Sequence, residues 1–351
     1  MTNVQGQAVG IDVSMDKIDC CFSQSVENMR VVIKGTRTFE NSNKGFEELA
    51  KWIKKWLIES MQLSLVMEAT GVYYEHLAYY FAEATSYKIC VLLPNKSKAF
   101  TQSLNVKSKN DKIDAKTLAQ MGLERNLFAW TAPSRPTQLI RGLCREKEAL
   151  IEEKTMITNQ LHAIECSKIS NKNTLKRLKA LIAFLDKQIK EIKEEVVLSV
   201  DDAPELAHSI ELLSSIPGVG RDTAVVILTE TNNFELFKNK AQLVSYAGLD
   251  VIENQSGSSV KGKTRISKKG NSRIRKALYF PAMSHINCKS IYYSLFENIV
   301  NRTKIKMKAY VAVQRKLLTL MYALHKNQTF FDPNFAQKSA EQKKFSAIGT
   351  L

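Results

Sequence analysis

Apolar and polar residues follow strand-like and helix-like periods in the first 115 residues. In AVGIDVSMDKIDCCF, residues 8–22, two apolar runs flank a turn at residues 15–17, which predicts a pair of strands. Ile11 and Val13 share one face of the first strand, so Asp12 points to the other. Further strands are predicted at 29–40, 63–67 and 88–93, amphipathic helices at 44–58 and 73–84, and a charged loop at 95–109.

From Thr137 the chain changes to helix-forming residues. Leu143, Leu150, Ile157 and Ile164 recur every seven residues, and a polar break follows at 167–173. Steps of three and four then continue through Leu175, Leu178, Ile182, Leu185, Ile189, Ile192 and Val196. This pattern predicts a protruding helical hairpin with a coiled-coil seam that associates with a second chain; two packed helices inside a globular domain are the alternative.

A second pattern lies at residues 212–228, LLSSIPGVGRDTAVVIL. Two helical runs around Ile-Pro-Gly-Val-Gly are typical of a helix-hairpin-helix motif. Gly218 and Gly220 permit a tight turn whose backbone N–H groups can meet a DNA phosphate without reading bases. The helical pattern continues at 241–249, 272–286 and 305–325, and a polar, disordered tail is predicted after residue 331.

The charge of the chain points to a polyanionic partner. It has 351 residues, with 51 Lys and Arg against 35 Asp and Glu, and a pI of about 9.4. No apolar run is long enough to span a membrane and no signal peptide is evident, so we expect a cytoplasmic protein. The six cysteines lack C-x-x-C spacing and zinc-type pairing with histidine, which favours reduced, inert thiols.

Four carboxylates stand out in this first region. Asp12 interrupts an apolar strand, Glu68 ends another strand, and Asp111 and Asp114 share a face of a helix that Asn110 can cap. Each alone is explained by a cap or a surface acid. Together they form the set that holds two Mg²⁺ ions about 4 Å apart around a phosphodiester.

The stretch from residue 254 to 276, NQSGSSVKGKTRISKKGNSRIRK, holds eight basic residues and no acidic one. Ser256 and Gly257 place a small hydroxyl on flexible backbone in this positive field, where it could attack phosphorus. A nucleic-acid-binding loop with incidental serines is the alternative. The predicted phosphate contacts are Lys261, Lys263, Arg265, Lys268, Lys269, Arg273 and Arg275.

In combination these motifs resemble the insertion-sequence 110 family of transposases, relatives of the pilin-gene invertase. GIDVS, MEATG and KNDKIDA match its RuvC-like, ribonuclease-H-fold acids at Asp12, Glu68, Asp111 and Asp114, and SGSSVKGKTRISKKGNSRIRKAL matches its serine stretch. The resemblance implies Mg²⁺ at the acids, a structured non-coding bridge RNA as guide, and a covalent serine–DNA intermediate at Ser256. Ser258 and Ser259 are close enough to be alternatives.

The fold class predicted is α/β plus all-α. A RuvC-like domain with a mixed sheet is expected at 1–130, a helical coiled-coil hairpin at 131–202, a helical domain with the helix-hairpin-helix and serine at 203–331, and a flexible tail at 332–351. We expect a nucleoid-associated bacterial or archaeal DNA recombinase that acts as a homodimer or homotetramer. A Mg²⁺-dependent Holliday-junction-type nuclease and a non-catalytic nucleic-acid scaffold are the rival hypotheses.

Overall fold

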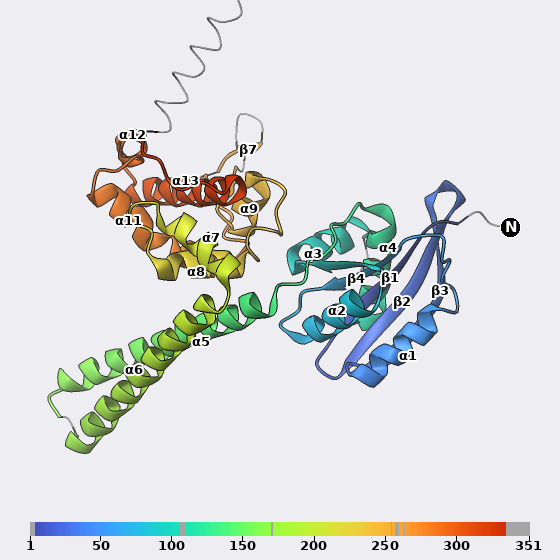
Figure 1. Cartoon of the computed structure of the whole chain (residues 1–351), viewed down its shortest axis with the longest axis horizontal. Helices are drawn as coiled ribbons and strands as arrows, with labels where there is room; N and C mark the ends of the chain where they lie inside the picture. The colour runs from blue at the N-terminus through green and yellow to red at the C-terminus, as the bar shows by residue number, and fades with distance from the viewer. Residues whose placement is uncertain are drawn as a thin grey trace, which may run out of the picture. The chain divides into compact units, whose positions relative to one another are not determined.

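A computed structural model describes residues 4–105, 110–169, 171–253, 255–256, 260–262 and 264–334. The chain divides into two compact units, Met1–Ala132 and Pro133–Leu351 (Figure 1). The helical hairpin predicted as a separate domain belongs to the second unit. Residues 335–351 of the predicted tail lie outside the described residues.

The first unit is built on a five-stranded mixed sheet with the strand order β3-β2-β1-β4-β5. β1, β2 and β3 are antiparallel neighbours, whereas β4 and β5 run parallel to β1. The predicted strand pair is confirmed, and it sets Asp12 directly across from Asp19. The strands are β1 (Val4–Val13), β2 (Lys17–Val26), β3 (Arg30–Glu40), β4 (Leu63–Glu68) and β5 (Lys88–Leu92).

Helices cover both faces of this sheet. Apolar side chains of α1 and α2 pack with Ile11 and Phe22 on one face, and those of α3 and α4 pack with Val66 and Cys90 on the other. A short 3₁₀ turn, Glu27–Met29, joins β2 to β3. The helices are α1 (Asn43–Ile53), α2 (Tyr73–Ala84), α3 (Pro94–Ser103) and α4 (Asp111–Glu124). The predicted α/β class with a RuvC-like sheet is confirmed.

Two predictions for the first unit are wrong in detail. Helix α3 occupies most of the segment predicted as a loop at 95–109. Pro94 is its first residue, where the missing N–H removes no hydrogen bond and the fixed φ suits a helix. The helix predicted at 44–58 also ends early, at Ile53.

The second unit begins with the predicted helical hairpin. Helices α5 (Arg135–Glu165) and α6 (Lys172–Asp201) run antiparallel, as ion pairs from Lys154 to Asp186 and from Lys179 to Glu165 show. The seam residues Ile157, Leu185, Ile189, Ile192 and Val196 are buried. Because α5 covers the seam of α6 within one chain, the seam does not require a second chain, and self-association stays a prediction.

The remaining helices surround one large core. They are α7 (Pro204–Ser214), α8 (Arg221–Glu230), α9 (Lys240–Tyr246), α10 (Ser272–Ala277), α11 (Tyr279–Asn287), α12 (Tyr293–Thr303) and α13 (Lys306–Asn327). The single helix predicted at 272–286 is wrong, because α10 and α11 meet at Leu278. Pro281 has no N–H to donate to the carbonyl of Ala277, which breaks the helical ladder there. Helix α12 was not predicted.

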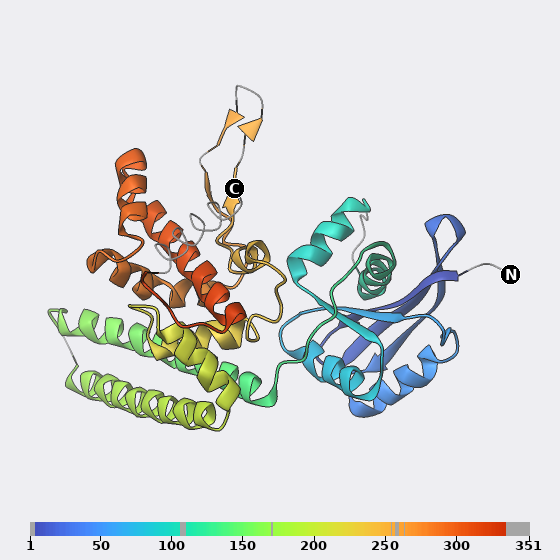
Figure 2. The same cartoon turned by 45° about the horizontal axis from the view of Figure 1, so that its top comes forward.

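Two short antiparallel ladders stand on a narrow arm that leaves these helices (Figure 2). The inner ladder pairs β6 (Val251–Ile252) with β9 (Arg265–Ile266). The outer ladder pairs β7 (Gln255–Ser256) with β8 (Val260–Lys261). Across the described part of both units, no helix combines the length and the apolar composition needed to cross a bilayer.

Candidate catalytic sites

Helix α4 lies against β1 at van der Waals distance, and this contact assembles the acids. A Cβ added to Gly10 would lie 2.0 Å from the carbonyl oxygen of Ala115 and 2.2 Å from the backbone nitrogen of Ala119. Only glycine allows this approach of helix backbone to strand backbone. Close packing continues along the helix at Gly122, where an added Cβ would lie 2.7 Å from the Val66 side chain.

The start of α4 is fixed as well. Asn110 caps the helix, and its Oδ1 accepts a hydrogen bond from the backbone nitrogen of Ile113 at 2.8 Å. Asp111 and Asp114 then fall in the first helical turn, where the positive end of the helix dipole favours carboxylates. The packing of α4 on Gly10 brings the first turn of the helix beside Asp12, which follows Gly10 by two residues in β1.

The electrostatics of Asp12 show that the predicted acids come together. Burial, and then repulsion from Asp114, Asp111, Glu68 and Asp19 in that order, together raise the pKa of Asp12 from its ordinary 3.8 to about 6. Such repulsion acts only between carboxylates that lie near one another. All four acids predicted from the sequence therefore contribute to one negatively charged site.

Two of these acids are turned toward protein partners. Lys17 Nζ donates to Asp111 at 2.7 Å, and the Ser97 hydroxyl donates to Glu68. Within the described ranges, no three Asp, Glu, His or Cys side chains stand in a geometry that would hold a metal ion. The donor set still fits a hard divalent cation, because it consists of carboxylate oxygens and the raised pKa of Asp12 records a repulsion that a cation would relieve.

The sequence did not predict three neighbours of this site. Asp19 is buried and lies opposite Asp12, and Lys17 Nζ contacts it at 3.2 Å while also holding Asp111. The predicted strand pair contained part of this signal, because a turn near residues 15–17 brings Asp12 close to the residues at 19 and 20 of the second strand. Ser97 had no such signal, since its segment was predicted as a loop.

The Ile-Pro-Gly-Val-Gly turn joins α7 to α8 as predicted. Gly218 has a φ of +81°, a region that disfavours other residues, and its added Cβ would meet the Ser284 hydroxyl at 2.7 Å. Pro217, Gly218 and Gly220 are exposed, and no side chain caps the first turn of α8 behind Gly220. These amides suit a phosphate contact, and that role stays a prediction.

Ser256 lies in β7, where it pairs with Val260 of β8. The base of this arm is tightly packed, because a Cβ added to Gly270 would lie 2.2 Å from the carbonyl oxygen of Tyr246. Gly248 has a φ of +66° and accepts a hydrogen bond from the backbone nitrogen of Lys268 at 3.1 Å. The arm that carries the predicted nucleophile therefore grows from a defined base.

A buried carboxylate also supports this base. Glu230 receives two hydrogen bonds from the Arg145 guanidinium, at 2.7 and 2.9 Å, and a third from the Asn271 amide at 2.7 Å. Burial raises the pKa of Glu230, but the bonds from Arg145 and Asn271 outweigh it and hold that pKa below its ordinary value. Asn271 also caps α10, so one residue joins the core to the arm.

Five of the seven predicted phosphate-contacting cations fall into two groups. Arg275 Nη1 donates to the carbonyl of Ala247 at 2.8 Å, and Arg273 forms an ion pair with Glu148 at 2.8 Å, so both serve intramolecular contacts. The side chains of a second group are exposed near the arm: Arg265, Lys268 and Lys269. Lys261 lies in β8, and Lys263, Ser258 and Ser259 lie outside the described residues.

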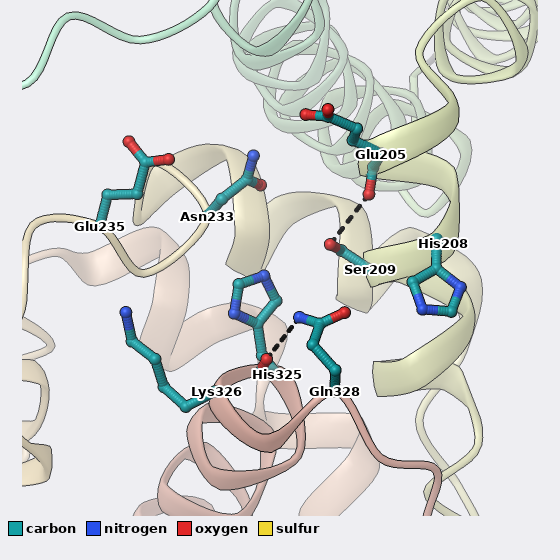
Figure 3. A pocket seen from close by; sticks show the side chains of 8 residues that line it. All are labelled: Glu205, His208, Ser209, Asn233, Glu235, His325, Lys326 and Gln328. Carbon is teal, nitrogen blue, oxygen red and sulfur yellow. Dashed lines mark hydrogen bonds between the residues drawn. The ribbon is translucent and has the colours of Figure 1, made fainter.

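A cavity of about 450 Å³ in the second unit was not predicted (Figure 3). Its lining comes from α7, the segment after α8 and the end of α13: Glu205, His208, Ser209, Asn233, Glu235, His325, Lys326 and Gln328. Burial lowers the pKa of His325, which favours its neutral form. Two carboxylates beside a single lysine do not suit a polyanion, so this cavity is no candidate for DNA.

Comparison with known proteins decides the family. A model of a transposase family with the DEDD acids matches residues 9–164, and the model described as "Transposase IS116/IS110/IS902 family" matches residues 210–296. The pilin gene-inverting protein of Moraxella bovis is 31% identical over 334 residues, covering 92% of this chain and 97% of that protein. The chain belongs to the IS110 family of transposases.

Other relatives agree with this assignment. The pilin gene-inverting protein of Moraxella lacunata is 30% identical over the same shares of both chains, and the transposase of insertion sequence IS1328 from Yersinia enterocolitica is 23% identical over 57% of this chain. A solved structure of T. thermophilus RuvC with a Holliday junction covers 35% of this chain and 99% of its own, at 8% identity and a TM-score of 0.28. The strand order in this IS110 transposase, not that last match, carries the fold assignment.

Proposed function

We propose that this IS110-family transposase is a site-specific DNA recombinase that uses Ser256 as nucleophile and the four acids as a divalent-metal site. The assembly of Asp12, Glu68, Asp111 and Asp114 around the α4–β1 contact carries the proposal, because like charges gathered beside one helix start need a cation to act together. Membership of a transposase family supports DNA as the substrate.

The reaction is a transesterification at phosphorus. The Ser256 hydroxyl oxygen forms a bond to the scissile phosphorus, its proton leaves to a base, and the bond from phosphorus to the deoxyribose oxygen breaks. That oxygen gains a proton and leaves as a hydroxyl. Attack by a hydroxyl of another strand on the serine phosphodiester reverses these steps and rejoins DNA, so no external energy source is needed.

Residues of this chain divide the remaining work. The exposed cations Arg265, Lys268 and Lys269 lie near the arm and can neutralise the phosphates of the strand being cut. The amides around Gly218 and Gly220 can hold backbone phosphates at a second point. A divalent ion such as Mg²⁺, held by Asp12 and its neighbours, would supply the positive charge that stabilises the oxygen leaving phosphorus.

We propose a structured non-coding RNA as a second partner, and self-association into a dimer or tetramer. The excess of 51 basic over 35 acidic residues supports polyanion binding beyond a single DNA duplex, and the family resemblance supplies the guide role. The pilin gene-inverting relatives suggest that inversion of a DNA segment is one outcome open to such a recombinase. RNA that copurifies with the protein and restores site choice when added back would support the guide.

A suicide-substrate trap tests the nucleophile. A target strand nicked close to the cleavage site loses its short leaving fragment, so any protein–DNA ester accumulates and can be mapped by mass spectrometry. We expect an adduct at Ser256 in the wild type and none in Ser256→Ala, with DNA binding kept.

Two controls sharpen this trap. Ser258→Ala and Ser259→Ala should both retain the adduct, whereas loss in either one with retention in Ser256→Ala would move the nucleophile. Cleavage without any adduct would instead support the Holliday-junction-type nuclease, in which the acids activate water. No cleavage under any metal condition would favour the non-catalytic scaffold.

A further inference from the structure

The last four helices, α10 to α13, concentrate positive charge outside the serine arm. Residues 272–327 contain eleven Lys and Arg side chains and one acidic side chain, Glu297. The positive charge therefore continues beyond the basic stretch at 254–276. A region of this composition attracts a polyanion, and its other surface residues decide which kind.

Four aromatic rings form a continuous row across α11, α13 and α12. Phe280 contacts Tyr279 at 5.6 Å between ring centroids, Tyr279 contacts Tyr310 at 6.3 Å, and Tyr310 contacts Phe296 at 5.3 Å. Phe296 and Tyr310 are half-buried and pack on the core, whereas Tyr279 and Phe280 are exposed. We call Phe280, Tyr279, Tyr310 and Phe296 the aromatic row.

Phe280 is the outermost ring of the row. Its side chain is 70% exposed, although burial of a phenylalanine would stabilise the protein by about 2–3 kcal/mol. It is part of α11, which packs on the core through Ala282 and Ile286, so the helix holds it in place. The molecule therefore keeps an apolar ring in water on a rigid support.

Exposed cations lie at the corner between α12 and α13, and one of them shares a helix face with a ring of the row. The segment from Lys304 to Lys308 alternates basic and apolar side chains, and Lys304, Lys306 and Lys308 are all exposed. Lys306 precedes Tyr310 by four residues on α13, which sets both on the same helix face. We call Lys304, Lys306 and Lys308 the lysine corner.

We infer that the aromatic row and the lysine corner bind a single-stranded segment of DNA, with bases stacked on Phe280 and Tyr279 and phosphates at the lysine corner. Exposed rings beside phosphate-binding cations are the means by which proteins hold unpaired bases irrespective of sequence. Paired bases cannot offer their faces to a ring, so duplex DNA does not fit. The choice of DNA rests on the proposed function, because strand cutting and exchange leave unpaired DNA near the enzyme.

Binding of short uncleaved strands to the full-length protein tests this inference. Fluorescence anisotropy compares a twelve-nucleotide oligothymidylate with an abasic strand of the same length, which keeps the phosphates and lacks the bases. We expect Phe280→Ala to weaken oligothymidylate binding by about 5- to 150-fold and to leave abasic-strand binding unchanged. Phe280→Trp should retain the binding of oligothymidylate.

The lysine corner has a separate signature. Replacing Lys304, Lys306 and Lys308 together by glutamine should weaken the binding of both oligothymidylate and the abasic strand. The slope of log affinity against log salt should fall in magnitude by about 2, since each phosphate contact on a single strand contributes about 0.7. The matched control replaces Lys187, Lys190 and Lys193 on α6, where two of the three pair with glutamates, and should change neither slope nor affinity.

Phe184→Ala is the control for the ring, because Phe184 is 56% exposed on α6 and lies outside the aromatic row. A strand carrying 5-iodouracil should crosslink on irradiation to Tyr279 or Phe280. Three outcomes would overturn the inference. Phe280→Ala could weaken binding of the abasic strand as much as that of oligothymidylate, or weaken neither. The crosslink could also form at residues other than Tyr279 and Phe280. Tighter binding of oligouridylate with the same dependence on Phe280 would assign the surface to RNA instead of DNA. None of these readouts depends on the serine adduct, so this inference and the proposed function can fail separately.

Discussion

The acid cluster and the serine arm are built in opposite ways. The acids project from a strand, from the end of another strand and from the start of a helix, and all three elements belong to one unit, a sheet with helices packed on both faces. Ser256 lies on a two-residue strand, in the segment between the end of α9 at Tyr246 and the start of α10 at Ser272. Regular elements place side chains by periodicity, so the acids could be predicted from pattern. The serine was suggested by a Ser-Gly pair in a basic stretch, where a binding loop with incidental serines was the alternative, and the family resemblance then favoured Ser256 as the nucleophile.

The two regions share one structural feature, which is a glycine at a point of close backbone contact. Gly10 allows α4 to pack directly on β1, and Gly270 allows the chain after β9 to pack against the carbonyl of Tyr246. In both cases the neighbour is backbone, which cannot rotate away from an added methyl group as a flexible side chain can. Each candidate catalytic segment is thus supported by close packing at a glycine outside the segment itself.

The largest effect is expected for Asp12→Asn. This change removes a carboxylate from the centre of the proposed metal site, and a loss of about 4 kcal/mol of transition-state stabilisation corresponds to about 1,000-fold slower cleavage. The fold should be kept or slightly stabilised, because the cost of burying a charged carboxylate and the repulsion from its neighbours, which together raise the pKa of Asp12, are both removed. Cleavage assays and thermal unfolding check both parts, and cleavage at the wild-type rate would contradict the acid-cluster assignment.

Substitution of the two glycines tests whether packing positions both regions. Gly10→Ala forces a methyl to within about 2 Å of α4 backbone, so we expect a loss of about 3 kcal/mol in the free energy of unfolding, with loss of cleavage. Gly270→Ala should cost a similar amount in the second unit.

Gly142→Ala is the matched control for these glycines. It lies within α5, and nothing is found within 4 Å of an added Cβ. Alanine is the better helix former, so this variant should gain about 0.5–1 kcal/mol. Chemical denaturation of all three variants measures the differences, and a stable, active Gly10→Ala would show that α4 does not depend on this contact.

The features that could be predicted from the sequence are those with a periodic pattern along the chain. Asp12, Glu68, Asp111 and Asp114 were predicted because each sits at a recognisable point of a periodic element. Contacts between distant segments, such as Glu230 with Arg145, produce no periodic pattern in the sequence. Helix α3 was missed for another reason, because Pro94 was interpreted as the end of a strand and not as the first residue of a helix. The row of rings on α11 to α13 was also missed, because its members come from three helices and meet only in the folded chain.

Glu230 offers a smaller effect that is specific to the second unit. Its lowered pKa means that the folded state favours the charged carboxylate, so its contribution to stability is present above the unfolded-state pKa and is lost as pH falls through the folded-state pKa. Glu230→Gln should cost about 2 kcal/mol at pH 7 by leaving Arg145 without a counter-charge, discounted for the partial exposure of that arginine.

The pH dependence separates this charge effect from simple loss of packing. The difference in unfolding free energy between Glu230→Gln and the wild type should shrink as pH falls through the lowered folded-state pKa of Glu230, because the wild-type carboxylate then also becomes neutral. Denaturation measured across acid pH supplies the test. A difference that stays constant with pH would mean that shape, not charge, accounts for the loss.

The smallest effect is expected at Lys17, which sharpens the account of the acid cluster itself. Its Nζ lies 2.7 Å from Asp111 and 3.2 Å from Asp19, and the pair with Asp111 is about half exposed. In the proposed metal site Asp111 must leave this partner to bind the cation, so Lys17→Gln removes a competing ion pair and also a repelling positive charge. We expect the Mg²⁺ concentration needed for half-maximal thermal stabilisation to fall by up to about fivefold, the range of an exposed ion pair. Lys51→Gln on α1 removes the same charge away from the site and should leave the Mg²⁺ requirement unchanged. If Lys17→Gln needs as much Mg²⁺ as Lys51→Gln does, Asp111 serves the ion pair alone and the metal belongs to Asp12, Glu68 and Asp114.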